Sequence, residues 1–231
     1  MSLTSNKKIT AVLFDVGGVL LKKLRDIDEQ ICDLLKLEKT EFTQAQTDVI
    51  STDAELIEEW KHINTLPKEV EYLNKFYSRV FERMGANKTP TEIQIATICQ
   101  VKRGYRLKEG AYEILEYLAD KYSLGMVTNS FASRRYFEIV DYDLGRFFKA
   151  IVISREIDSD KPSEKIFLET LKLMHVPASE AVLIDDKEKN LAAAKKLGFG
   201  ELVLLSKSQN QTTSDGSYLH ISKLTDLKEL L

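Results

Sequence analysis

The stretch ITAVLFDVGGVL at residues 9–20 combines an apolar run with a tight turn. Residues 9–14 are β-branched or apolar almost throughout, which is typical of a strand that is buried on both faces of a parallel sheet. The run ends at Asp15, and the Gly17-Gly18 pair that follows favours a turn. We therefore expect a buried strand at 9–14 with Asp15 at its carboxyl end.

The same kind of unit recurs in the second half of the chain. Short apolar runs predict four more strands, at 124–127, 150–153, 182–184 and 201–205. Helical patterns lie among them, at 109–122, 133–140, 162–174 and 188–197. Strands that alternate with helices of about 10–15 residues indicate right-handed βαβ units. The sequence therefore predicts the α/β class, with a doubly wound parallel sheet.

Residues 22–106 interrupt this alternation with helical patterns and no convincing strand. Apolar side chains at helical spacing form four stripes in this part of the chain. The stripes are Ile27, Ile31, Leu34 and Leu35; Leu56, Ile57, Trp60 and Ile63; Val70, Leu73, Phe76, Tyr77, Val80 and Phe81; and Ile93, Ile95, Ile98 and Val101. Because long structureless loops are uncommon in compact domains, we expect an inserted all-helical domain at 22–106. The α/β core then comprises residues 1–21 and 107–231.

The composition is that of a globular protein with no strong charge bias. Of the 231 residues, 43% are hydrophobic and 30% are charged, and 33 Lys and Arg face 36 Asp and Glu. This balance gives no basic footprint for nucleic acid or an anionic membrane. No apolar run approaches the roughly 18 residues of a spanning helix, and the first run is too short for a signal peptide. We expect a cytoplasmic monomer or homodimer with no nucleic-acid or membrane partner.

The two cysteines and the last 26 residues add smaller expectations. Cys32 and Cys99 show no CxxC spacing and no disulfide framework, so free thiols in a reducing compartment are expected. The polar stretch 206–217 predicts a surface loop, and residues 222–231 predict a last helix.

Polar residues follow four of the predicted elements, at the side of an α/β sheet where ligands bind. They are Asp15-Val16-Gly17-Gly18, Thr128-Asn129-Ser130, Lys161-Pro162 and Asp185-Asp186. Taken singly, each segment has a structural explanation as a turn former, a helix cap or a solvated charge. Their convergence at one edge of the sheet favours a functional site.

Together these side chains have the chemistry of a phosphate-processing site. Asp15 offers a carboxylate nucleophile, which can form an aspartyl-phosphate and divide hydrolysis into two easier steps. Asp185 and Asp186 supply the hard oxygen ligands that Mg²⁺ prefers. Lys161 adds a positive charge, and Thr128 with the amides after it can hold phosphoryl oxygens.

The same segments carry a family resemblance. FDVGGVL at 14–20, VTNS at 127–130, Lys161-Pro162 and IDDKEKNLAAAKKLGF at 184–199 resemble, in order, the four motifs of the haloacid dehalogenase-like hydrolases. The resemblance covers about 9–21 and 107–205, and the fourth motif is its most specific part. It implies a Rossmann-like core, and the helical insert is similar to the family's C1-type cap, which is expected to close during transfer.

The resemblance also implies a function and a role for each site residue. It implies a Mg²⁺-dependent phosphatase that acts on a small phosphorylated metabolite through an aspartyl-phosphate on Asp15. It implies catalytic roles for Asp15, Thr128 and Lys161. It implies phosphate or substrate contacts for Gly17, Gly18, Thr128, Asn129 and Lys161. It implies metal contacts for Asp15, the Gly17 carbonyl, Asp185 and Asp186, with Asn190 supporting the metal loop.

Gly17 departs from the family pattern. Phosphatases of the family usually carry a second Asp two residues after the nucleophile, and this Asp protonates the leaving oxygen and then activates water. Such proton transfer commonly contributes about 10²–10⁴ in rate. Two alternatives therefore stay open: a non-catalytic or weakly active phosphate-binding protein, and a 2-haloacid dehalogenase, although the Asp185-Asp186 pair speaks against the latter.

Overall fold

The computed structural model describes residues 8–206, 213–214 and 216–231, and these residues form two compact units. One unit comprises the described part of Met1–Lys22 together with Leu107–Ser130 and Tyr142–Leu231, and we call it the α/β unit. The other comprises Lys23–Arg106 and Phe131–Asp141, and we call it the helical unit. The sequence pattern assigned 131–141 to the core, whereas the contacts of this segment group it with the helical insert.

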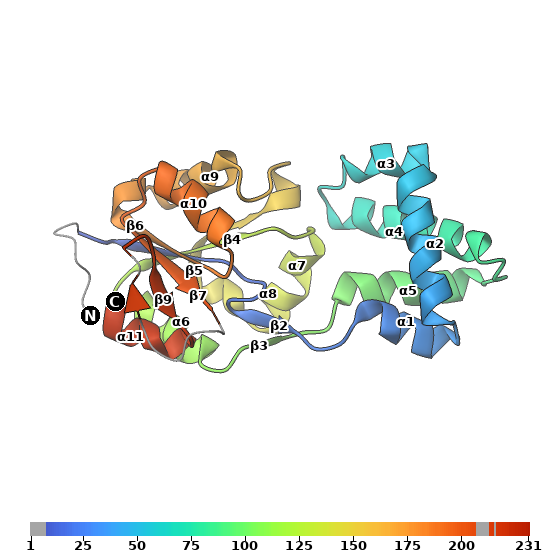
Figure 1. Cartoon of the computed structure of the whole chain (residues 1–231), viewed down its shortest axis with the longest axis horizontal. Coiled ribbons are helices and arrows are strands. Elements are labelled where there is room, and N and C mark those ends of the chain that lie inside the picture. The colour runs from blue at the N-terminus through green and yellow to red at the C-terminus, as the bar shows by residue number, and fades with distance from the viewer. Residues whose placement is uncertain (1–7, 207–212, 215) are drawn as a thin grey trace. The chain divides into compact units, whose positions relative to one another are not determined.

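The α/β unit is built on a mainly parallel sheet in which β1, Ala11–Phe14, is an interior strand between β4 and β6 (Figure 1). The strand order among the described residues is β5-β4-β1-β6-β7-β9-β8. The other strands are β4 (Ser123–Thr128), β5 (Phe148–Ile153), β6 (Ala181–Asp185), β7 (Glu201–Leu205), β9 (Leu219–Ile221) and the antiparallel β8 (Thr213–Ser214). All four residues of β1 are fully buried, and Phe14 lies opposite Met126 on β4 and Ile184 on β6.

Helices cover both faces of this sheet. Figure 1 shows α9 (Glu164–Met174) and α10 (Glu188–Lys196) over one face, with α6 (Ala111–Ala119) and α11 (Leu227–Leu230) over the other. Burial of the sheet on both faces explains why its strands are nearly continuous apolar runs. The doubly wound parallel fold with a helical insert is thus confirmed.

The structure also departs from several expected elements of the core. The helix expected at 133–140 is two short helices, α7 (Ser133–Tyr136) and α8 (Glu138–Asp141), separated by a non-helical Phe137. The helix expected at 222–231 is a 3₁₀ turn at Leu224–Asp226 followed by α11. Most of the polar stretch 206–217 lies outside the described residues, and β8 and β9 were not predicted because they are too short to show an alternating pattern.

The helical unit packs five helices of the insert around an aromatic core. They are α1 (Ile27–Leu35), α2 (Lys39–Thr52), α3 (Ala54–Trp60), α4 (Leu66–Arg83) and α5 (Pro90–Lys102). Phe42 of α2 stacks on Tyr77 and Phe81 of α4, with ring centroids 6.2 and 6.1 Å apart. A capping box between Thr89 and Glu92 fixes the start of α5.

Two details of the insert differ from the predicted stripes. The sequence pattern missed α2, because only Phe42, Ala45 and Val49 of its fourteen residues are buried. Four members of the predicted stripes are exposed, namely Leu34, Ile57, Trp60 and Ile98. The predicted apolar faces are therefore wider than the faces that the helices bury.

The insert is joined to the core through two short strands that the sequence did not predict. β2 (Leu21–Lys23) pairs with β3 (Tyr105–Leu107) where the chain leaves the core and returns to it. Three residues are too few for a strand period to be recognised. Within the described residues, no helix is long and apolar enough to cross a membrane.

Candidate active site

Three neighbouring parallel strands end in the predicted site residues. Asp15 follows β1, Thr128 ends β4, and Asp185 ends β6. Since β4 and β6 flank β1 in the same direction, their carboxyl ends meet at one edge of the sheet. Both aspartates and Thr128 are buried there. The four polar segments of the sequence therefore converge, as their positions after strands predicted.

Lys161 joins the nucleophile candidate to the acidic motif. Its Nζ lies 2.6 Å from Oδ1 of Asp15 and 2.8 Å from Oδ2 of Asp185, and its side chain is only 2% exposed. The residue precedes Pro162, and the peptide bond between them is cis. Burial alone would lower the pKa of Lys161, but the two carboxylates raise it above its usual value. Lys161 is thus held as a cation between Asp15 and Asp185.

Asn129 fixes the loop that carries Lys161. Its Nδ2 donates to the backbone carbonyl of Lys161 at 2.9 Å, and its Oδ1 accepts from the backbone N–H of Lys161 at 2.6 Å. The resemblance assigned Asn129 a contact with phosphate or substrate. In this structure the amide group braces Lys161, which is a role that the sequence did not indicate.

The acidic groups of the site fit a divalent cation. Asp15, Asp185 and Asp186 each offer one carboxylate oxygen, and these oxygens lie within 4.8 Å of one another. One lysine neutralises only one of the three charges. In addition, Oδ1 of Asp186 is buried and has no hydrogen-bond partner among the described residues. A hard cation that prefers oxygen ligands would bind Oδ1 of Asp186 and would balance the excess negative charge.

The pKa values of two of these carboxyl groups, Asp15 and Asp186, are raised above their usual range. Burial and the neighbouring Asp185 raise the pKa of Asp15 to about 6, although Lys161 opposes the shift. Burial and Asp185 also raise the pKa of Asp186. Both shifts disfavour the charged forms in the absence of a cation.

Asp185 is oriented by groups of the following turn and helix. Asn190, on α10, donates from Nδ2 to both oxygens of Asp185 at 2.9 and 3.0 Å. The backbone N–H of Lys187 donates to Oδ1 at 2.9 Å. The structure thus places Asn190 as a brace of the acidic loop, the position that the resemblance implied for it.

The two glycines of the Gly17-Gly18 turn differ in backbone conformation and in the space around them. Gly18 has φ +92°, and a Cβ there would lie 2.7 Å from Cγ of Asp186, so only glycine fits beside the acidic loop. At Gly17, in contrast, a Cβ would have no heavy atom within 4 Å, and φ lies outside the left-handed region. Neither space nor backbone conformation therefore requires glycine at position 17.

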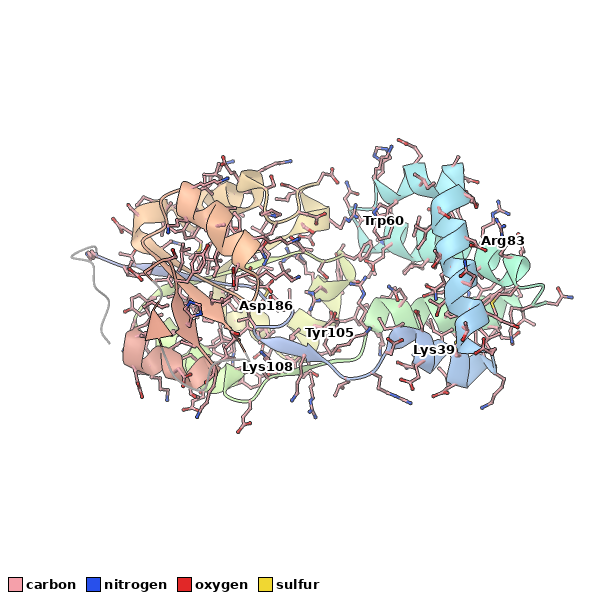
Figure 2. The ribbon with its side chains drawn as sticks, viewed as in Figure 1. Lys39, Trp60, Arg83, Tyr105, Lys108 and Asp186 are labelled. Atoms are coloured by element: carbon pink, nitrogen blue, oxygen red, sulfur yellow. The ribbon has the colours of Figure 1, made fainter. Side chains whose placement is uncertain are left out.

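Lys108 contacts this turn and was missed by the sequence analysis. Its Nζ donates to the carbonyl of Gly18, and its backbone N–H donates to the carbonyl of Leu20 at 2.8 Å. Figure 2 labels Lys108 and Asp186, which both belong to the α/β unit. The only signal in the sequence was a lysine directly after β3, where the chain returns to the core.

The α/β unit thus combines a parallel sheet with a buried aspartate–lysine–aspartate network at its carboxyl edge. A profile of the haloacid dehalogenase-like hydrolases matches residues 9–198. The chain therefore belongs to this family, as its motifs predicted.

Relatives and solved structures agree with this assignment. The chain is 24% identical over 196 residues to the glyceraldehyde 3-phosphate phosphatase of Methanopyrus kandleri, covering 82% of this chain and 81% of the relative. Its fold is similar to that of a 2-haloacid dehalogenase from Pseudomonas syringae, with a TM-score of 0.67, 20% identity and coverage of 96% and 97% of the two chains. It is also similar to a HAD family enzyme of Bacteroides thetaiotaomicron solved with magnesium and inorganic phosphate, with a TM-score of 0.61, 19% identity and coverage of 87% and 96%.

Proposed function

We propose that this protein is a Mg²⁺-dependent phosphatase that hydrolyses a small phosphorylated metabolite through an aspartyl-phosphate on Asp15. The observation that carries the proposal is the position of Lys161 between Asp15 and Asp185, beside the orphaned oxygen of Asp186. This arrangement pairs a buried carboxylate nucleophile with positive charge and leaves acidic groups for a metal. The phosphatase names of its curated relatives support the same reaction class.

Each residue has a defined task in the proposed reaction. A carboxylate oxygen of Asp15 attacks phosphorus in line with the leaving oxygen, and the P–O bond to the leaving group breaks. Lys161 balances negative charge on Asp15 and the transferred phosphoryl group, while the Thr128 hydroxyl donates to a phosphoryl oxygen. Asp15, Asp185 and Asp186 would hold Mg²⁺, and the ion would supply neutralisation of negative charge there. Water then attacks phosphorus of the aspartyl-phosphate, the P–O bond to Asp15 breaks, and the Asp15 carboxylate and inorganic phosphate are released.

Gly17 limits the leaving groups that this site handles well. It carries no carboxyl group to protonate the departing oxygen, so a strongly basic alkoxide leaves slowly. Esters with weakly basic leaving groups, such as p-nitrophenyl phosphate or a sugar 1-phosphate, need less help from an acid. We therefore propose that the chain favours phosphates of this second class.

A substrate panel tests the proposed function. It should contain p-nitrophenyl phosphate, sugar 1- and 6-phosphates and glyceraldehyde 3-phosphate, each with Mg²⁺ and with EDTA. We expect phosphate release that needs Mg²⁺ and is fastest for the weakly basic leaving groups. Activity that persists in EDTA would contradict the metal assignment. If no substrate of the panel released phosphate, the result would favour a phosphate-binding protein. Halide release from 2-haloacids would favour a dehalogenase.

Mg²⁺ should also stabilise the folded protein. At a concentration about a hundredfold above Kd, binding to the native state contributes about 2.7 kcal/mol. For a chain of this size, this corresponds to a rise in Tm of roughly 5–10 °C. Asp186→Asn should raise the metal-free Tm, because it relieves repulsion from Asp185, and should reduce the response to Mg²⁺. Differential scanning calorimetry with and without Mg²⁺ measures both effects.

An exposed aspartate provides the control for this measurement. Asp33→Asn, which removes a partner of Arg25 on the surface of α1, should leave the response to Mg²⁺ unchanged. If the Tm of the wild-type protein did not change with Mg²⁺ up to millimolar concentrations, the result would contradict the proposed Mg²⁺ site.

A further inference from the structure

A buried serine follows strand β5, beside the loop of residues 128–130 that we call the Thr128 loop. Thr128 lies opposite Ile153, where both β4 and β5 end. The next residue, Ser154, is 1% exposed and begins a short 3₁₀ turn, Ser154–Glu156. Its hydroxyl takes no part in the proposed chemistry, and its hydrogen bonds show what it holds instead.

The hydroxyl of Ser154 bonds to both backbone groups of Ser130. The Ser130 N–H donates to Oγ of Ser154 at 3.1 Å, and this Oγ donates to the Ser130 carbonyl at 3.3 Å. The backbone N–H of Arg155 donates to the same carbonyl at 3.3 Å. Because Ser130 and Ser154 are both buried, these bonds lie out of water and fix the chain two residues after Thr128. The amide of Ser130 is thus directed to Ser154 and not to a phosphoryl oxygen.

The carbonyl of Ser154 holds the segment 157–161, which leads to Lys161 and which we call the Lys161 segment. This carbonyl accepts from the backbone N–H of Ile157 at 3.3 Å and from that of Ser159 at 3.1 Å. Ser154 therefore contacts the Thr128 loop through its hydroxyl and the Lys161 segment through its carbonyl.

Asn129 provides a second link between the same two parts of the chain. Its side chain bonds to both backbone groups of Lys161, at 2.9 and 2.6 Å. Asn129 directly precedes Ser130, so the residue that Ser154 holds is covalently bonded to the residue that holds Lys161. All of these residues belong to the α/β unit, and each link is a direct hydrogen bond.

We propose that Ser154 is a positioning residue that holds the Thr128 loop and the Lys161 segment at a fixed spacing. By fixing Ser130, it keeps Asn129 on the backbone of Lys161. In this way it sets the spacing at which the Thr128 hydroxyl and the Lys161 ammonium meet phosphate. The contact with phosphate rests on the proposed function. The link between the two parts rests on the hydrogen bonds of Ser154 and Asn129, and the two are tested separately.

The test compares Ser154→Ala and Ser154→Cys with a control, Thr170→Val. Ser154→Ala removes the hydroxyl, whereas Ser154→Cys fills its space with a thiol that hydrogen-bonds only weakly, and so preserves the packing if Ser154→Ala folds poorly. Thr170 of α9 is also fully buried, but its hydroxyl donates to the carbonyl of Ile166 in the same helix at 2.8 Å. The control therefore removes a buried hydroxyl of the α/β unit without removing a bond of Ser154 or Asn129.

Amide exchange of the ligand-free chain, followed by NMR at single residues, tests the link between the two parts. The informative amide is that of Lys161, because its acceptor, Oδ1 of Asn129, is present in every variant. In both Ser154 variants this amide should exchange about 3- to 10-fold faster, a change that corresponds to the net contribution of one hydrogen bond. Thr170→Val should leave its rate unchanged. The N–H of Lys187 in the acidic loop should keep its wild-type rate in all three variants, which excludes a global effect.

Phosphate binding by the chain in the presence of Mg²⁺ tests the consequence for the site. In calorimetric titration with inorganic phosphate, both Ser154 variants should raise Kd about 3- to 10-fold, whereas Thr170→Val should not change it. With p-nitrophenyl phosphate, KM should rise more than kcat falls in the Ser154 variants, because they retain the nucleophile Asp15 and disturb the groups that hold the phosphate.

The outcomes separate the two proposals. Unchanged exchange at Lys161 in both Ser154 variants would overturn the positioning role, whatever the activity. Equal losses of phosphate affinity in the Ser154 variants and in Thr170→Val would also overturn it, because the effect would then be general destabilisation. A wild-type protein that neither binds nor releases phosphate would contradict the proposed function, while faster exchange at Lys161 in the variants would still support the role of Ser154.

Discussion

Asp15→Asn should abolish phosphate release, with a fall in kcat/KM of about 10³-fold or more. The amide is nearly the same size as the carboxylate but is a far weaker nucleophile, so the aspartyl-phosphate cannot form. The variant also loses the charge that pairs with Lys161 at 2.6 Å. Steady-state kinetics with p-nitrophenyl phosphate and Mg²⁺ measures the effect.

The fold should survive this substitution. Lys161 keeps its contact with Asp185 at 2.8 Å, and the variant removes a carboxylate whose pKa is raised to about 6 by burial and by Asp185. A Tm close to that of wild type, together with a normal circular dichroism spectrum, is therefore expected. Asp33→Asn again provides the control, with full activity. Normal turnover by Asp15→Asn would show that Asp15 is not the nucleophile.

Much of the α/β unit was predictable because burial on both faces leaves a strong sequence signal. The run 9–14 predicted β1, and all four residues of that strand are fully buried. The site was predictable for a related reason. Parallel strands end at the same edge, so polar residues after β1, β4 and β6 had to lie close together.

Other features depend on contacts between residues that are distant in sequence. Nothing local distinguishes Ser133 as a partner of Glu69, so the membership of 131–141 in the helical unit could not be foreseen. Likewise, nothing local indicates that the amide group of Asn129 hydrogen-bonds to the backbone of Lys161. The space around Gly17 is also a property of the folded turn and not of the sequence.

Gly17→Asp should increase the rate of phosphate release from esters with basic leaving groups by about 10²-fold, at the lower end of the range for general acid–base catalysis. The turn accepts a side chain at this position, because no heavy atom lies within 4 Å of the added Cβ. Asp15 lies two residues away in the chain, and its negative charge favours the protonated form of the new carboxyl group, which is the form that donates a proton. Comparison of kcat for sugar 6-phosphates between the variant and wild type measures the gain.

The dependence on the leaving group makes this prediction specific. A proton donor helps a basic alkoxide most, so the gain should be large for sugar 6-phosphates and small for p-nitrophenyl phosphate. Gly17→Asn has nearly the same size but transfers no proton, so it should give no such gain. The kcat of Gly17→Asp should also fall at high pH as the new group ionises, whereas that of Gly17→Asn should not show this added dependence. Equal rates for the two variants would mean that a group other than residue 17 already supplies the proton, and that the glycine does not limit turnover.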